Sequence, residues 1–263
     1  MSDITLAELC ITAAAESFRG DGDILATGIG LVPRLAASLA KMTFEPGLMM
    51  TDGEAFLVSE PVPVGPRGNY TPKIEGIMTY ERVFDIIYRG HRHAMVGPVQ
   101  VDRWGQMNIS IIGEYEKPKS ALLGVRGFPG NTISHANSMF VPQHSKRSFV
   151  EGEVDMVGGI GYNKARWPNG KMPKFLELRH IITNLCVMDF NGPDHAMRVI
   201  SLHPGVTFAD VQEATSFPLI EADDVAETPA PTPEQLDLIR NVLDPHNLRA
   251  TIFKENPPMR RAA

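Results

Sequence analysis

Two carboxylates follow a stretch of sequence that is predicted to be a strand. Asp52 and Glu54 flank Gly53, directly after the apolar segment 47–51. Ligands of open α/β sheets bind at the carboxyl ends of the strands. Two neighbouring carboxylates can there divide acid and base roles, because mutual repulsion and burial raise the pKa of one of them. The plainer interpretation is a solvated turn that Asp52 caps.

A second candidate is the turn Gly28-Ile29-Gly30, which lies between a predicted strand and a predicted helix. Backbone N–H groups at the start of a helix favour an anion or a developing oxyanion. The alternative is a tight turn that needs glycine for steric reasons alone. Leu31, Val32 and Pro33 follow, so the dinucleotide-binding pattern of three spaced glycines is missing.

Other kinds of site find no support in the sequence. Cys10 and Cys186 have no metal-ligand spacing and form no disulfide framework, which favours a reducing compartment. The histidines are scattered without the spacing of a zinc site. Neither a Gly-x-Ser-x-Gly elbow nor a phosphate-binding P-loop occurs. We therefore expect no metal.

Composition narrows the class of protein further. The 263 residues are 43% hydrophobic and 21% charged, which is typical of a globular chain with one large domain or two small ones. Lys and Arg number 25 against 31 Asp and Glu, so we expect no nucleic-acid partner. No apolar run approaches the roughly 18 residues of a membrane span, and the first residues lack a basic signal region. These features predict a cytoplasmic protein without a membrane partner.

The predicted elements alternate in the manner of a parallel α/β sheet. Thr5 and Glu8 have the spacing of a capping box and start a helix. A strand, a helix and a strand follow at 23–27, 32–41 and 47–51. Further elements are expected as a helix at 80–88, strands at 93–97 and 98–101, a hairpin of 180–190 with 196–202, and a capped helix at 207–214.

The remaining segments define the expected domain organisation. Residues 124–174 are rich in Gly, Asn, Ser, His and Pro and are expected to form functional loops. With the apolar stretch around Phe140 they are expected to form a subunit interface. We assign 1–225 to one domain and 226–263 to a connector, a C-terminal helix and a tail that frays from Glu255 onward.

Five segments, in order and in register from about Leu25 to Leu219, resemble the β subunit of class I coenzyme A transferases. They are Ala26–Pro33, Phe84–His91, Gly97–Asp102 with Gly105 and Asn108, Thr183–Phe190, and His203–Thr207. The resemblance implies an open, mainly parallel sheet flanked by helices. It also implies a partner α subunit and a CoA thioester substrate.

Two departures from the family pattern bear on the reaction. The family carries its nucleophilic glutamate in a Ser-Glu-Asn-Gly segment, and matching that glycine to Gly53 puts Thr51 at the glutamate position. A transferase needs the glutamate to form an anhydride and then a thioester, which threonine cannot do. In the segment 126–130, Pro129 stands in a glycine-rich turn and removes one backbone donor.

A branch of the family fits these departures, namely the actinobacterial hydrolases that open the last steroid ring in cholesterol and bile-acid breakdown. Met50–Ala55 and Phe140–His144 resemble that branch. The resemblance implies an α2β2 heterotetramer that hydrolyses a carbon–carbon bond of a cyclic diketone CoA thioester. The catalytic glutamate is then expected on the α subunit, and no cofactor is expected beyond the CoA of the substrate.

On this chain the resemblance assigns supporting catalytic roles to Asp52 and Glu54. The residues expected to bind the substrate or its CoA are Gly28, Gly30, Gln100, Asn108, Gly127, Gly130 and Asn131. Two alternatives stay open. One is a CoA transferase of the 3-oxoacid or glutaconate type that uses Asp52 or Glu54 as nucleophile, although aspartate is one methylene short. The other is a ligand-binding scaffold without enzymatic activity.

Overall fold

The computed structural model describes residues 4–52, 56–122, 124–125 and 127–259. Its centre is a seven-stranded sheet in the order β1-β5-β10-β11-β12-β13-β14. The strands are Leu25–Gly28, Arg92–Val96, Ala136–Val141, Glu177–Thr183, Cys186–Asp189, Arg198–Leu202 and Ile220–Glu227. The pairs β1–β5, β5–β10, β10–β11 and β13–β14 are parallel, whereas β12 is antiparallel to both neighbours. The expected mainly parallel sheet is confirmed.

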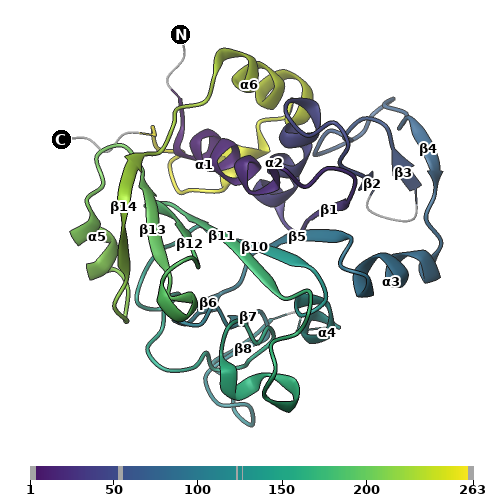
Figure 1. The fold of residues 1–263 in the computed structure, drawn as a ribbon. Helices are drawn as coiled ribbons and strands as arrows, with labels where there is room; N and C mark the ends of the chain where they lie inside the picture. Colours follow the sequence, from purple (N-terminus) through teal and green to yellow (C-terminus); the bar gives the residue numbers. More distant parts are fainter. Residues whose placement is uncertain (1–3, 53–55, 123, 126, 260–263) are drawn as a thin grey trace.

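Helices α1 (Leu6–Ala15) and α2 (Leu31–Met42) cover one face of this sheet, beside α6 (Pro233–Asp237) (Figure 1). The predicted capping box is present, since the Thr5 hydroxyl accepts from the Glu8 N–H and the Glu8 carboxylate accepts from the Thr5 N–H. Both helices place small and aliphatic residues against Ala26, Met95 and Phe140 of the sheet. The helices thus form the first layer of the core.

The C-terminal segment is part of the same core. After α6 a wider helical stretch, Leu238–Leu243, buries Ile239 and Leu243 among the residues of α1 and α2. Strand β14 runs across the expected boundary between 225 and 226 and pairs with β13. The expected frayed tail is wrong as far as residue 259, because Met259 N–H donates to Ile4 O and Pro258 bridges Thr5.

Two further sequence expectations need correction. Residues 180–190 are not one strand: Thr183 Oγ1 accepts from the N–H groups of Leu185 and Cys186, which ends β11 and turns the chain into β12. The stretch around Phe140 is not an interface. It is β10, buried in the sheet between β5 and β11, and Phe140 is 6% exposed.

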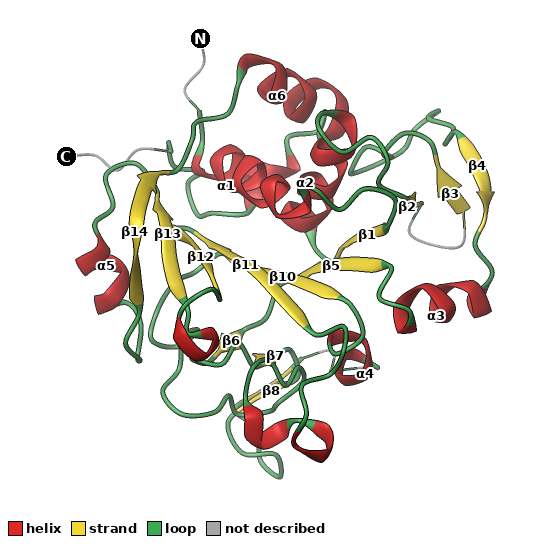
Figure 2. Cartoon of the chain, viewed as in Figure 1, coloured by secondary structure: helices red, strands yellow, loops and turns green. Residues whose placement is uncertain are grey.

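The second face carries shorter elements. They are β6 (Gln100–Val101), β7 (Met107–Asn108), β8 (Ile111–Ile112), β9 (Ser120–Ala121), α4 (Phe128–Thr132) and α5 (Phe208–Glu213). Met107, Phe128 and Phe149 pack there against Ala94, Met139 and other residues of the sheet. Beyond β1, a small sheet of β2 (Met50–Thr51), β3 (Phe56–Val58) and β4 (Ile74–Ile77) leads into α3 (Tyr80–Tyr88) (Figure 2). Within the described ranges, no helix has the length and apolar character needed to cross a membrane.

Candidate active site

The turn after β1 brings the start of α2 very close to the strand. A Cβ atom on Gly28 would lie 2.4 Å from backbone atoms of Pro33 and Arg34, so only glycine fits. Gly30 has φ +116° and is the N-cap of α2, which has no side-chain cap. The Ile29 N–H donates to Met95 O at 2.9 Å and fixes the turn on β5. The first N–H groups of α2 are therefore left for an anion, as the sequence predicted.

Thr51 lies on the same face of the sheet as Thr27. Leu25 and Met49 form a parallel bridge, so two residues further on Thr27 and Thr51 are neighbours across β1 and β2. Ala26 and Met50 point the other way, into the core beneath α1 and α2. The position where the family resemblance expects glutamate thus faces the second side of the sheet.

Asp52 is committed to a partner. The Arg67 guanidinium donates to both carboxylate oxygens of Asp52, with Nη1–Oδ2 at 2.9 Å, and the Asp52 side chain is only 11% exposed. Burial lowers the pKa of the nearby Arg34, the Asp52 charge opposes that effect, and the Arg67 charge adds to it. A carboxylate held in a two-pronged pair is poorly suited to attack a substrate. Glu54 lies outside the described residues, so its expected supporting role stays a prediction.

Gln100 and Asn108 face each other across the β6–β7 ladder and are buried. Asn108 Nδ2 donates to Gln100 Oε1 at 2.7 Å and to Ile111 O at 2.6 Å, while Asn108 Oδ1 accepts from Ser110 N–H. Gln100 Nε2 donates to Asp155 Oδ2 at 3.0 Å. These bonds make the two amides the brace of the hairpin. Their expected contact with the substrate or CoA stays a prediction.

Gly127, Gly130 and Asn131 belong to α4, just before β10. Gly127 has φ +78° and caps the helix, and Asn131 N–H donates to Gly127 O. A Cβ atom on Gly130 would lie 3.9 Å from the Tyr88 hydroxyl at the end of α3. Pro129 stands in the first turn of α4, where a helix does not use its N–H groups, so the donor it lacks costs no hydrogen bond there. The expected loss at Pro129 is corrected in that respect.

The sequence interpretation missed Arg92, at the start of β5. Its Nε donates to Thr27 Oγ1 at 3.0 Å, and within the described chain no carboxylate pairs with it. Burial lowers its pKa to about 10, so the guanidinium keeps its charge at neutral pH. A cation inside a stretch that reads as a buried strand, between His91 and His93, was the signal available in the sequence.

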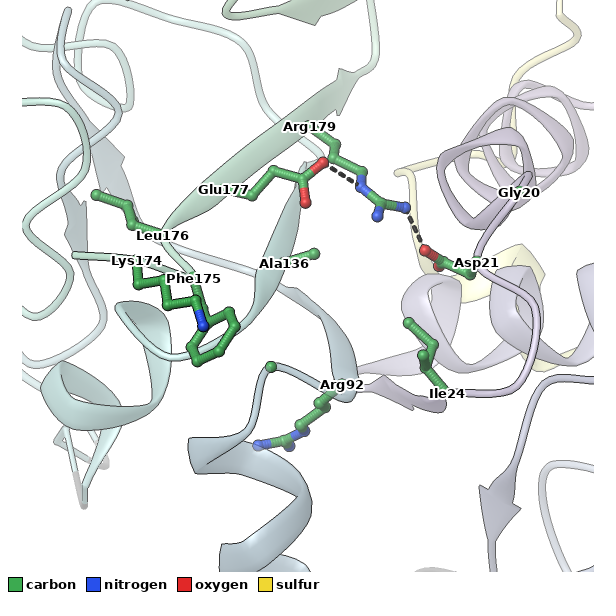
Figure 3. A pocket seen from close by; sticks show the side chains of 11 residues that line it. Gly20, Asp21, Ile24, Arg92, Ala136, Lys174, Phe175, Leu176, Glu177 and Arg179 are labelled. Carbon is green, nitrogen blue, oxygen red and sulfur yellow. Dashed lines mark hydrogen bonds and ion pairs between the residues drawn. The ribbon is translucent and has the colours of Figure 1, made fainter. Parts of the chain in front are cut away.

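The carboxylates nearest to Arg92 already have other partners. Arg92 lines a cavity of about 410 Å³ together with Asp21, Glu177 and Arg179. Arg179 pairs with both Asp21 and Glu177, and His93 Nδ1 lies 2.7 Å from Asp21 Oδ2. Figure 3 shows the Arg92 side chain pointing away from this ionic array. The positive charge of Arg92 is therefore free to meet an anion.

His135 is the second residue that the sequence interpretation passed over. Its Nδ1 lies 2.8 Å from Ala136 O, which makes Nδ1 the protonated nitrogen, and the buried Nε2 has no partner among the described residues. Burial, opposed by the bond to Ala136 and aided by the Arg92 charge, lowers its pKa to about 4. His135 is thus a neutral acceptor close to a cation. No sequence signal separated it from the other histidines.

The arrangement suits stabilisation of negative charge. One face of the sheet combines a fixed cation, a neutral acceptor and a helix start, but no described carboxylate free to act as nucleophile beside Thr51. The described residues also contain no group of three His, Cys, Asp or Glu side chains arranged to hold a metal. A base must come from elsewhere, from Glu54 or from another chain.

Comparisons with known proteins agree with this arrangement. The chain is 46% identical over 245 residues to the cholesterol ring-cleaving hydrolase IpdB subunit of Mycobacterium tuberculosis, which covers 93% of this chain and 97% of that one. It is 31% identical over 257 residues to the B-type subunit of the 3-oxoadipate CoA-transferase of Pseudomonas knackmussii, covering 91% and 94%. The crystal structure of Rhodococcus jostii RHA1 IpdAB superposes with a TM-score of 0.86 at 42% identity, covering 96% of this chain and 100% of that one. No family model matches the sequence.

Proposed function

Because the chain belongs to the class I coenzyme A transferase family, as a β subunit alongside the cholesterol ring-cleaving hydrolases, we propose that it is the β subunit of such a hydrolase. The enzyme opens the last steroid ring in cholesterol and bile-acid breakdown by hydrolysing a carbon–carbon bond. Its substrate is the CoA thioester of a cyclic diketone.

The observation that carries the proposal is the pair Thr51 and Asp52 at the end of β2. Thr51 cannot form the acyl intermediates of a transferase. Asp52 is held by Arg67 and does not replace the missing glutamate. What the face offers instead is positive charge, through Arg92, and charge stabilisation is what the cleavage of a diketone needs.

The partner is an α subunit of the same family, in an α2β2 heterotetramer, and it supplies the catalytic glutamate. An exposed apolar surface on this chain supports the assembly. Its residues lie on β3, β4 and α3 and are exposed by 38% to 79%: Phe56, Ile74, Ile77, Tyr80, Phe84 and Tyr88. No partner is needed among nucleic acids or membranes.

The enzyme works in the cytoplasm and without a cofactor beyond the CoA of its substrate. Both cysteines are free and buried, which suits a reducing compartment. Dialysis of the assembled complex against a chelator is expected to leave its activity unchanged. Loss of activity that a divalent metal restores would contradict this part of the proposal.

The function is tested with the co-expressed α and β chains and a cyclic diketone CoA thioester. Mass spectrometry should show a product heavier by one water, with the thioester intact. A transferase would instead move CoA to an added carboxylic acid. Borohydride reduction after incubation with the thioester should leave every carboxylate of the β chain unmodified, whereas a reduced Asp52 or Glu54 would establish the transferase alternative.

A further inference from the structure

We propose that Arg92 binds the oxygen on which negative charge appears when the ring bond breaks, with Thr27 orienting its guanidinium. The inference rests on the proposed hydrolytic function and assigns the anion-binding role within the same site.

Arg92 stands apart from the other partly buried arginines of the chain. Arg198 pairs with Asp189, Arg240 with Glu8, and Arg249 with Glu8 and Asp244. Arg92 has only a hydroxyl as partner within the described residues. An enclosed cation without a counter-ion is costly to the fold, so its retention calls for an anionic ligand.

The position of Arg92 leaves its terminal nitrogens open to a ligand. Arg92 donates through Nε to Thr27, so the Nη1 and Nη2 hydrogens remain available. Arg92 pairs in register with Leu25, so it lies on the face of β1 that carries Thr27 and, across β2, Thr51. The guanidinium is therefore directed to the place where a family transferase would hold its glutamate.

His135 supplies an acceptor close to this cation. His135 is 1% exposed and its Nε2 has no partner in the described chain, while the Arg92 charge acts on its imidazole. A donor and a bare acceptor together fit a ligand that presents both an anionic oxygen and a hydroxyl or water hydrogen. A hydrated diketone has both groups.

Atoms and electrons balance in the step that these groups would assist. A base on the α subunit takes a proton from water, and the hydroxide adds to one ring carbonyl. As that carbon becomes a carboxylic acid, the ring carbon–carbon bond breaks and its electron pair moves onto the second carbonyl, giving an enolate. Arg92 donates its Nη hydrogens to the enolate oxygen until the carbon takes a proton back from the base.

The test uses the assembled complex with Arg92→Ala, Arg92→Lys and Thr27→Val. Arg92→Ala should lower kcat about 100-fold or more with little change in KM, since oxyanion donors act mainly in the transition state. Added guanidinium ion should restore at least tenfold of the loss. Thr27→Val, which removes only the orienting hydroxyl, should lower kcat by about three- to tenfold. The matched control is Arg103→Ala, an exposed arginine over the Trp104 ring, which should behave as wild type in all assays.

A second measurement follows the bound diketone by its ultraviolet absorption, which differs between the enol and the enolate. Wild type should bind the enolate and Arg92→Ala the neutral form. This readout needs no ring opening, so it tests Arg92 even if the wild-type complex fails to add water and the proposed function is wrong. The inference is overturned by wild-type kcat in Arg92→Ala, by a change confined to KM, or by a loss that guanidinium does not restore. If Arg92→Ala does not assemble, wild-type kcat and enolate binding in Thr27→Val overturn it.

Discussion

Thr27 and Arg92 join β1 to β5 through one side-chain hydrogen bond, in which Arg92 Nε donates to Thr27 Oγ1 at 3.0 Å. Thr27 has Thr51 as its neighbour on the other side, across β2. A glutamate at position 51 would therefore stand close to the guanidinium and neutralise it, whereas threonine leaves the charge to a ligand. The exchange of one residue both removes a nucleophile and exposes a cation.

Restoring the glutamate should therefore harm the hydrolase. Thr51→Glu is expected to lower ring opening by about 10²-fold, because the new carboxylate pairs with Arg92 and repels a developing enolate. Thr51→Gln, of the same shape but neutral, should retain substantially more activity. Steady-state kinetics of the two assembled complexes decides, and equal activities would show that charge at this position is irrelevant.

Asp52 should position the loop that carries Arg67 rather than react. Asp52→Asn is expected to lower ring opening by about 10²-fold while gel filtration shows an intact complex. Arg67→Gln should cause a loss of similar size, and the double variant should lose little more than either single one, because both break the same pair. Replacing the catalytic glutamate of the α subunit should be far more damaging. Complete inactivity of an assembled Asp52→Asn complex would instead make Asp52 the primary base.

Glu8 should anchor the C-terminal segment to α1. Burial raises its pKa, but the bonds from Arg240, Thr5 and Arg249 outweigh burial and hold it at about 2. Since this is below the unfolded value, the stabilisation is present above about pH 4.3 and is lost as pH falls toward 2. Glu8→Gln should lower the free energy of unfolding by about 3 kcal/mol at neutral pH, because two buried arginines lose their partner. Denaturant titration checks this, with exposed Glu16→Gln as control.

Three buried histidines should make the protein sensitive to mild acid. Burial lowers the pKa of His135 to about 4, that of His144 to about 3 and that of His203 to about 4. The unfolded chain binds protons at these residues from about pH 6.5 downward while the folded chain does not, so stability falls as pH drops from about 6.5 to 4. His203→Gln should reduce that slope, which unfolding curves at several pH values measure. An unchanged slope would mean that His203 does not titrate differently in the two states.

Two glycines at the expected site should respond oppositely to the same substitution. Gly28→Ala puts a Cβ 2.4 Å from the backbone of Pro33 and Arg34 and should cost about 3 kcal/mol or prevent folding. Gly130→Ala, inside α4 with the Tyr88 hydroxyl 3.9 Å away, should leave the fold unharmed and stabilise it by up to about 1 kcal/mol. Thermal unfolding of the two variants compares them directly. Equal stability would contradict the close approach of α2 to Gly28.

Features that depend on neighbours along the chain could be predicted from the order of amino acids alone. Thr5, Thr207 and Thr232 each start a helix with a partner three residues away, so their capping boxes were readable without a fold. Alternating apolar stretches predicted the mainly parallel sheet, and the register of Gly53 revealed threonine at the glutamate position. Local hydrogen bonds and periodic burial act over a few residues, which is why a pattern reveals them.

The pairing of charges, in contrast, emerged only from the folded chain. Asp52 meets Arg67 fifteen residues away, and Arg92 meets Thr27 across 65 residues, while the carboxylates that share its cavity are held by Arg179. The sequence supplied all these groups but not their pairing, and His135 carried no pattern at all. Burial and partner choice together set whether a charged group is spent on the fold or left for a ligand, and both arise only when distant segments pack.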